Sequence, residues 1–178
     1  MRNELKDATA AIHDRIDHAV GALPLLSEKD YAAFLGAQYT ARSIVERALA
    51  KQSPPETGAP PSQLPALEAD LEELGASARP GEMTLDLRNE YEALGAAWVL
   101  AGSSMGNRTI LAQRRRAGLT NAERFLSDAA MPRYFKQLLR TMDSSNGRPM
   151  VDDAICGARK AFAVFETCFE SIGLEKAA

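Results

Sequence analysis

The hydrophobic residues of this chain recur mostly at steps of three and four, which is the spacing of one face of an α-helix. Near the N-terminus the recurring positions are Leu5, Thr9, Ile12, Ile16 and Val20. They predict a first helix over about residues 3–21. No stretch alternates with a period of two, so the sequence gives no reason to expect strands.

A second helix is predicted to begin after Ser27, which is a good N-cap residue, with Asp30 three positions on as a weaker form of the capping-box acid. Its apolar face is broad. The positions on that face are Tyr31, Phe34, Leu35, Gln38, Ile44, Val45 and Leu49.

Prolines and glycines divide the rest of the chain. Residues 53–65 hold five of the nine prolines and predict a loop that is too short to separate two domains. A short helix follows over about 66–74 and ends at Gly75, and Arg79-Pro80-Gly81 marks another turn.

The second half of the chain is also predicted to be helical. A long helix runs from about 87 to 117, with a glycine break near 102, and Gly118 is its C-cap. The segment 120–123, Thr-Asn-Ala-Glu, fits a capping box, and Pro132 suits the first turn of a helix over 133–142. A turn is expected at 144–149.

The last predicted helix begins near Val151 and ends at Gly173. Its apolar stripe is formed by Ile155, Ala158, Phe162, Phe165, Phe169 and Ile172. We therefore expect residues 1–178 to form a single all-α domain, a compact bundle of six to eight helices.

Composition narrows the classes of partner and the compartment. The net charge of −3 gives no electrostatic case for nucleic acid or an anionic membrane as the main partner. No apolar run approaches the ~20 residues of a membrane-spanning helix, and the N-terminus lacks the apolar stretch of a signal peptide. A cytoplasmic location is expected. Cys156 and Cys168 lie twelve residues apart on one predicted helix and are expected to be two buried thiols.

Candidate chemistry begins with His13, one of only two histidines. Lys6, Thr9, His13 and Asp17 share one side of the first helix, with Lys6 and His13 ~10 Å apart along the axis. This layout suits a metal at His13, an anionic ligand edge near Lys6 and an outer hydrogen-bond partner in Asp17, as a haem would require. The alternative is a semi-buried histidine with a structural hydrogen bond. His18 falls on another face and is expected to be exposed.

Glycines form the second unusual feature. Gly95, Gly102 and Gly106 lie within one predicted helix, where each costs ~1 kcal/mol relative to alanine. Gly102 and Gly106 share a face and leave a smooth strip of backbone, beside which Ser103 and Ser104 could hold water. Close helix packing and a simple loop break are equally good interpretations of the glycines alone.

Together these two segments resemble the haem oxygenases. Leu5-Lys6-Asp7-Ala8-Thr9-Ala10-Ala11-Ile12-His13 looks like the proximal-helix motif, and Val99-Leu100-Ala101-Gly102-Ser103-Ser104-Met105-Gly106 resembles the distal-helix motif of the bacterial members. The order and separation of the motifs agree with that family, as does the late aromatic helix. The resemblance spans most of the chain.

The resemblance implies a role for each matching residue. His13 would be the proximal iron ligand, with Thr9 near it, and Lys6 would pair with a haem propionate. Gly102, Ser103 and Gly106 would form the catalytic distal surface over the haem. Asn107 could reach the same pocket. Arg159 is a candidate for the second propionate, as is Lys160, although exposed helix charges would look the same.

The implied reaction converts haem, O2 and electrons to biliverdin, CO and ferrous iron. Haem is both cofactor and substrate, and the electrons would come from a ferredoxin, a flavodoxin or an NAD(P)H-dependent reductase. The run 114–116 of three arginines is expected to be an exposed basic face, either for an acidic electron donor or merely solvated.

The distal segment departs from the family pattern. Ser103 stands where animal members have an aspartate, Ala101 where bacterial members have a glutamate, and Asn107 where a second glycine is usual. These departures leave open an alternative, a haem- or bilin-binding protein without turnover. A non-haem interaction protein on the same fold is a third hypothesis. A di-iron site fits poorly, because the chain has only two histidines.

Overall fold

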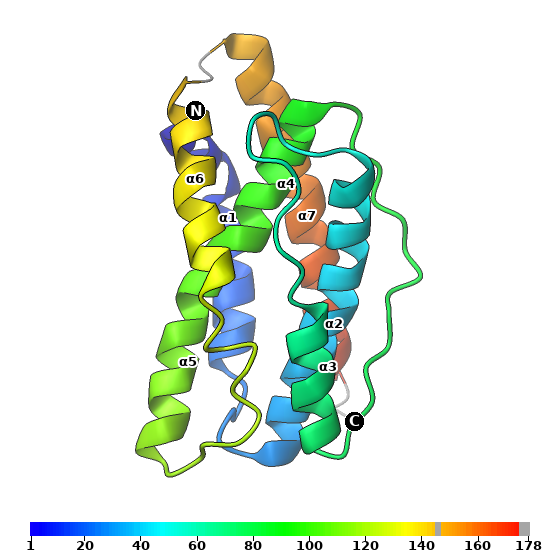
Figure 1. Ribbon diagram of the computed structural model, residues 1–178, viewed down its shortest axis with the longest axis vertical. Helices are drawn as coiled ribbons and strands as arrows, with labels where there is room; N and C mark the ends of the chain where they lie inside the picture. The colour runs from blue at the N-terminus through cyan, green and yellow to red at the C-terminus, as the bar shows by residue number, and fades with distance from the viewer. Residues whose placement is uncertain (145–146, 175–178) are drawn as a thin grey trace.

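The computed structural model describes residues 1–144 and 147–174 as a bundle of helices, and this part of the chain contains no strand. Figure 1 shows the helices arranged largely along one long axis. The helices are α1 (Arg2–Gly21), α2 (Glu28–Lys51), α3 (Leu64–Glu73), α4 (Glu90–Gly102), α5 (Ser104–Arg116), α6 (Ala130–Ser144) and α7 (Arg148–Leu174). The predicted all-α fold class is confirmed.

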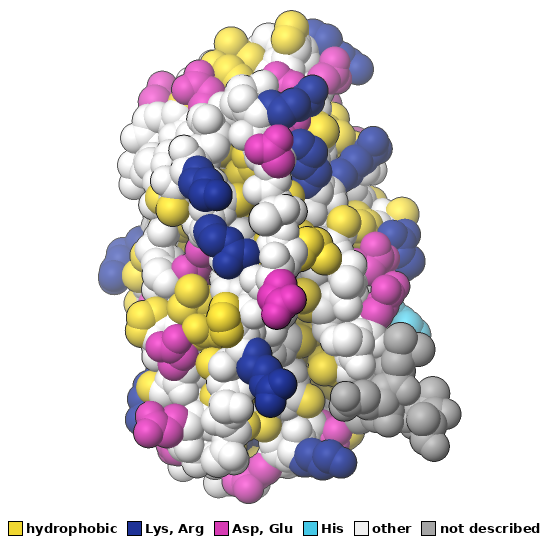
Figure 2. Space-filling view, turned by 90° about the vertical axis from the view of Figure 1, so that its right-hand side faces the viewer, with side chains coloured by type: hydrophobic (Ala, Val, Ile, Leu, Met, Phe, Trp, Pro, Cys, Tyr) yellow, Lys and Arg dark blue, Asp and Glu magenta, His cyan; other side chains and the backbone are white. Residues whose placement is uncertain are grey.

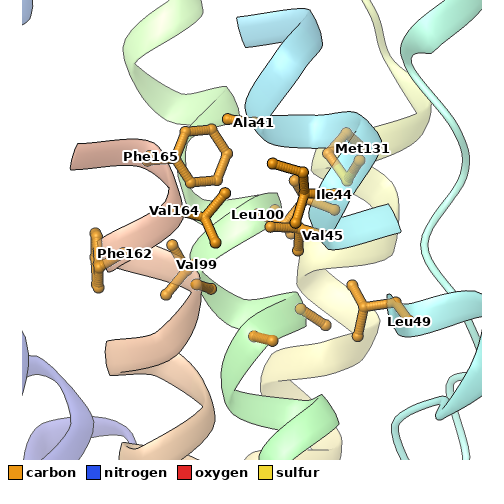
Figure 3. Close-up of a cluster of buried hydrophobic side chains, with 14 of the residues drawn as sticks. Ala41, Ile44, Val45, Leu49, Val99, Leu100, Met131, Phe162, Val164 and Phe165 are labelled. Carbon is orange, nitrogen blue, oxygen red and sulfur yellow. The ribbon is translucent and has the colours of Figure 1, made fainter. Parts of the chain in front are cut away.

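The centre of the bundle is the crossing of α4 and α7, the most extensive helix contact of the described chain. Helix α7 also packs against α1 and α2, so it contacts three other helices. Figure 3 shows side chains from α2, α4, α6 and α7 pointing toward one another in this core. Those with the least exposure include Val45, Leu49, Leu100 and Met131.

Two glycines allow α4 and α7 to approach backbone to backbone. A Cβ atom added to Gly95 of α4 would lie 1.8 Å from the carbonyl oxygen of Ala154, and one added to Gly157 of α7 would lie 1.9 Å from the carbonyl oxygen of Glu92. Neither atom could fit without separating the helices. For Gly95, close packing is therefore the correct interpretation.

A buried carboxylate also joins these two helices. Glu92 of α4 is fully buried and accepts hydrogen bonds from Lys160 Nζ of α7 at 2.8 Å, from the Arg88 backbone N–H at 2.9 Å and from Arg88 Nε at 2.6 Å. Burial by itself would raise the pKa of Glu92. The hydrogen bonds from Lys160 and Arg88 outweigh burial and bring the pKa down to about 2.

This lowered pKa predicts an acid-sensitive fold. A carboxyl whose pKa is lower in the folded state stabilises the protein above its unfolded pKa, and that contribution disappears as the pH falls through the folded pKa. We expect the free energy of unfolding to drop by up to about 3 kcal/mol between about pH 5 and pH 2 through Glu92 alone. Urea unfolding at a series of pH values should show a clearly shallower acid slope in Glu92→Gln. Equal slopes in the two proteins would contradict the role given to Glu92.

The helix boundaries predicted from sequence are largely confirmed, including the cap of α2, where the Asp30 backbone N–H donates to Ser27 Oγ at 3.4 Å. The helix expected from about 87 begins at Glu90, and the glycine break expected near 102 divides it into two helices that meet at Ser103. Helix α7 begins three residues earlier than predicted, and of the turn expected at 144–149, residues 145–146 lie outside the described chain.

The capping box predicted at 120–123 is wrong, because no helix begins there. Glu123 instead pairs with Arg115, whose Nη2 lies 2.6 Å from its carboxylate. The segment 117–129 is held by Asp70, which accepts the backbone N–H groups of Arg124 and Phe125. The acid that caps the following helix, α6, is Asp128, which accepts from the backbone N–H groups at 130 and 131.

The expected basic face at 114–116 is also partly wrong. Arg114 is fully buried, with its guanidinium carbon 3.5 Å from the centre of the Tyr31 ring. Arg115 is paired with Glu123. In the described structure, Arg116 is therefore the one arginine of the three that is exposed and outside any ion pair. On the face that Figure 2 shows, basic and acidic side chains are interspersed and neither sign forms a continuous field.

Two further expectations concern cysteines and membranes. Both cysteines are free, and Cys168 is buried as predicted while Cys156 is half-buried. Among the described helices, none combines the length and apolar character that crossing a membrane would require.

Candidate functional site

A cavity of about 390 Å³ lies between α1, the α4–α5 junction and α7. Its size falls in the range of about 300–1,000 Å³ typical of small-molecule sites. The lining is mainly aromatic and aliphatic, with few polar groups. It consists of His13, Ile16, Asp17, Val20, Phe34, Gln38, Trp98, Val99, Gly102, Ser103, Met105, Gly106, Asn107, Ile110, Phe135, Phe162, Phe165 and Phe169.

Helix α1 supplies one wall. It packs against α7 and has no extensive contact with α4 or α5, so the cavity separates it from them. His13 projects from this wall with its ring edge-on to Phe162, at a centroid distance of 6.0 Å. The side chain of His13 is 53% exposed, and that of Met105 on the α5 side is also exposed, so the cavity is open to solvent.

The imidazole of His13 has one defined partner. Its Nδ1 lies 3.2 Å from Oδ2 of Asp17, one turn further along α1. A carboxylate only accepts hydrogen bonds, so this contact favours the neutral tautomer with its proton on Nδ1. The lone pair is then on Nε2, the nitrogen left free for a metal.

The opposite wall is made where α4 ends and α5 begins. A Cβ atom added to Gly102 would meet only the ring of Phe135, at 3.8 Å, and one added to Gly106 would meet nothing within 4 Å. These two glycines, unlike Gly95, are therefore not required by helix packing. Their lack of side chains leaves space beside the cavity that they line.

Polar groups beside the glycines are few. Ser103 lines the cavity, and its Oγ donates to the carbonyl oxygen of Leu100 at 2.8 Å. Asn107 is buried and lines the cavity as well. Ser104 does not line it, because its hydroxyl points back to the carbonyl oxygen of Ala101 at 2.6 Å.

Behind this wall lies Arg42 of α2, which sequence reasoning missed. It is fully buried, donates from Nη2 to Ser103 Oγ at 2.6 Å and donates from Nε to Gln38 Oε1 at 3.1 Å. Burial lowers its pKa to about 10, so it is still charged at neutral pH. The sequence signal was the polar pair Gln38 and Arg42, four residues apart on an otherwise apolar helix face.

Four residues predicted for the site do not line the cavity. Lys6 is exposed, and Thr9 is buried with its hydroxyl bonded to the carbonyl oxygen of Leu5 at 2.7 Å. Arg159 lines a separate hollow beside α1 and donates to the carbonyl oxygen of Ala8 at 3.3 Å. Lys160 is engaged with Glu92. The structure thus brings together His13, the two glycines, Ser103 and Asn107, and leaves the basic residues outside.

A metal site made by side chains alone has little support. Nowhere in the described residues do three or more His, Cys, Asp or Glu side chains gather in a way that could hold a metal ion. An iron atom here would need most of its ligands from another group, such as a macrocycle.

Comparison with known proteins gives an informative match among solved structures. No protein-family model matches the sequence, and no curated protein sequence matches it. Among solved structures, the chain is similar to the haem oxygenase from Neisseria meningitidis, known in NO- and CO-bound forms. The TM-score is 0.72 at 24% sequence identity, over 96% of this chain and 90% of the other. The chain therefore has the fold of a haem oxygenase.

Proposed function

We propose that this protein is a haem oxygenase, which binds haem in the cavity described above and converts it, with O2 and electrons, to biliverdin, CO and ferrous iron. The observation that carries the proposal is the placement of His13 and the open glycines Gly102 and Gly106 on walls of the same apolar cavity. His13 is proposed as the iron ligand and the glycines as the distal surface.

The residues present fit a haem. A flat apolar macrocycle is matched by the ring faces and edges of Trp98, Phe135 and Phe162. A neutral imidazole is a usual axial ligand of haem iron, and the pairing of His13 with Asp17 leaves Nε2 available for that role. Haem bound there would supply the iron that activates O2.

The chain's own residues would shape the space on the distal side. Gly102 and Gly106 keep side-chain atoms away from it, so a small ligand has room beside the ring. Ser103 and Asn107 are the polar groups of this wall that could hold a water and move a proton.

We also propose which residues would pair with the haem propionates. Lys6 takes part in none of the ion pairs found in residues 1–144 and 147–174, so its ammonium group is available to an anionic haem edge. Thr9 and Arg159 already bond to backbone carbonyls of α1 and are weaker candidates. Alanine variants at these three positions, titrated with haemin, should show the largest loss of affinity for Lys6→Ala.

A second function, binding of haem or a bilin without turnover, is favoured by one observation. Among the described residues that line the cavity, Asp17 is the only carboxylate, and it is paired with His13 on the α1 wall. The wall near the glycines therefore has no acid to feed protons to bound oxygen, and turnover would depend on water held by Ser103, Asn107 and Gln38.

One experiment separates these functions. Haemin is added to the purified protein, then ascorbate or a reductase system with O2, and the absorption spectrum is recorded over time. We expect a Soret band that decays as biliverdin appears. A Soret band that persists through reduction would indicate a binder, and the absence of any Soret shift would exclude both functions.

The distal glycines give a separate test. Gly106→Leu should fold at least as well as the unmodified protein, because its Cβ meets no neighbour and leucine favours helix by ~1 kcal/mol. The added side chain should reduce haemin affinity by about tenfold through steric overlap. Thermal unfolding and a haemin titration measure the two effects. Unchanged haemin affinity in a stable Gly106→Leu variant would remove Gly106 from the proposed site.

A further inference from the structure

Arg42 is a buried cation with an unusual set of partners. Its side chain is fully buried, and its guanidinium carbon lies 4.9 Å from the centre of the Phe125 ring. Within the described chain it belongs to none of the ion pairs, and its Nη1 group is buried without a hydrogen-bond partner. The carboxylates of Glu46 and Asp128 favour its charged form without forming an ion pair with it, so they only partly offset the cost of burying the charge.

The first neighbour, Gln38, is fixed in orientation by Arg42. A guanidinium has only donors, so the Gln38 atom that faces Arg42 Nε at 3.1 Å must be the amide oxygen. The other end of the amide is the NH2 group with two donors, which makes no hydrogen bond to any described residue. Because Gln38 lines the cavity, this NH2 group is the end left to serve a ligand there.

The second neighbour, Ser103, also has its hydrogen bonding set by Arg42. Arg42 Nη2 donates to Ser103 Oγ at 2.6 Å, and the hydroxyl proton goes to the carbonyl oxygen of Leu100 at 2.8 Å. A positive charge beside Oγ disfavours a second donor approaching that oxygen. A ligand in the cavity would therefore meet Ser103 as a donor, once its proton turns away from Leu100.

We propose that Arg42 is a positioning residue that turns the Gln38 NH2 group toward the cavity and leaves Ser103 able to meet a ligand only as a donor. This donor corner, formed by Gln38 and Ser103 with Arg42 behind them, selects small ligands that accept hydrogen bonds, and anions most strongly. The buried charge adds a favourable field for an anion in a site of low dielectric. The consequence for ligands of haem iron rests on the proposed function, whereas the donor orientation does not.

The orientation is tested first in the haem-free protein by ¹⁵N NMR of side-chain groups. We expect the Arg42 Nε–H proton to exchange slowly with solvent, and the Gln38 NH2 protons to exchange at least about tenfold faster, because only the latter face the cavity. A protected Gln38 NH2 group together with rapidly exchanging Arg42 Nε–H would overturn the proposal, whether or not the protein binds haem.

The ligand preference is tested with azide on the ferric haemin complex and CO on the ferrous complex. Removing the guanidinium in Arg42→Met should lower azide affinity by about tenfold, the effect of losing one well-placed donor. The C–O stretching frequency should rise, because fewer donors and less positive charge face the bound ligand. A merely structural role for Arg42 would leave this frequency unchanged.

A second variant keeps the test decisive if Arg42→Met does not fold. Gln38→Glu retains an oxygen toward Arg42, now as an ion pair, and replaces the cavity-facing NH2 group by a second carboxylate oxygen. It should fold and bind azide at least about tenfold more weakly. Azide affinity equal to that of the unmodified protein would refute the donor corner.

The matched control is Arg114→Met. Arg114 is also fully buried, packs on an aromatic ring and has a buried nitrogen without a partner in the described chain, but it is not among the residues that line the cavity. We expect its azide affinity and C–O stretching frequency to match those of the unmodified protein, and a parallel change would contradict the proposal. Failure of the proposed function is seen separately, as the absence of a Soret shift when haemin is added to the unmodified protein.

Discussion

Substitution of His13 by alanine is expected to abolish the absorption signature of imidazole-ligated ferric haem while leaving the fold intact. The imidazole lines the cavity, and no other described residue of the lining carries an imidazole. Its side chain is 53% exposed, and its removal should change the free energy of unfolding by less than about 0.5 kcal/mol. Haemin titration followed by absorption spectroscopy measures the loss.

His18 provides a matched control for this substitution. It is an exposed histidine on the same helix and does not line the cavity. His18→Ala should therefore bind haemin with the spectrum of the unmodified protein. Added imidazole should restore a ligated spectrum to His13→Ala, because it can enter the space that the side chain has left. Identical spectra for His13→Ala and the unmodified protein would show that another group ligates the iron.

Asp17 refines the same prediction. Outer partners of metal-bound histidines typically change metal affinity by 10- to 100-fold when removed. Asp17→Asn keeps a hydrogen-bond acceptor next to His13 Nδ1 but removes the negative charge, so we expect haemin to bind more weakly with the histidine-ligated spectrum retained. Haemin titrations of Asp17→Asn and His13→Ala are then compared. The first variant measures the effect of orienting the His13 ring, and the second measures the effect of removing the iron ligand.

The helices were predictable because their apolar periodicity is long and their breaks are chemically marked. The breaks depend only on local sequence and can therefore be recognised directly, as in the proline-rich segment 53–65 and at Ser27 and Gly118. The capping box at 120–123 failed because its acid, Glu123, is used by Arg115 across a turn. A local motif cannot reveal a competing partner that only the folded chain brings near.

The candidate site was predictable in its backbone and its histidine, and not in its buried charges. His13 and the glycines belong to short sequence motifs that can be recognised without the structure. Arg42 and Arg114 were missed because a lone arginine, or a run of them, normally indicates a solvated surface. Their burial depends on rings that lie far along the chain, Phe125 for Arg42 and Tyr31 for Arg114.

The largest effect on stability is expected from Gly95→Ala at the crossing of α4 and α7. The new methyl group would lie 1.8 Å from the carbonyl oxygen of Ala154 and 2.9 Å from the backbone nitrogen of Ala158. These are backbone atoms of a packed helix, so the helices themselves must separate. We expect a loss of about 3 kcal/mol or more in the free energy of unfolding, measured by urea denaturation.

Gly36→Ala in α2 is the control, because a methyl group there meets no atom within 4 Å. It should stabilise the protein by roughly 0.5–1 kcal/mol, as alanine does in an unobstructed helix. Equal urea midpoints for the two variants would mean that α4 and α7 are not in backbone contact.

The same crossing also sets the shape of the candidate site. Helix α4 continues from Gly95 to Gly102, and α7 continues from Gly157 to Phe162, so separating the helices at the crossing moves two parts of the cavity lining. Where Gly95→Ala remains folded at low temperature, its haemin affinity should fall together with its stability, although the substituted residue does not line the cavity. Three glycines of one α4–α5 segment thus act differently, since Gly95 fixes how closely the helices approach while Gly102 and Gly106 leave room for a ligand.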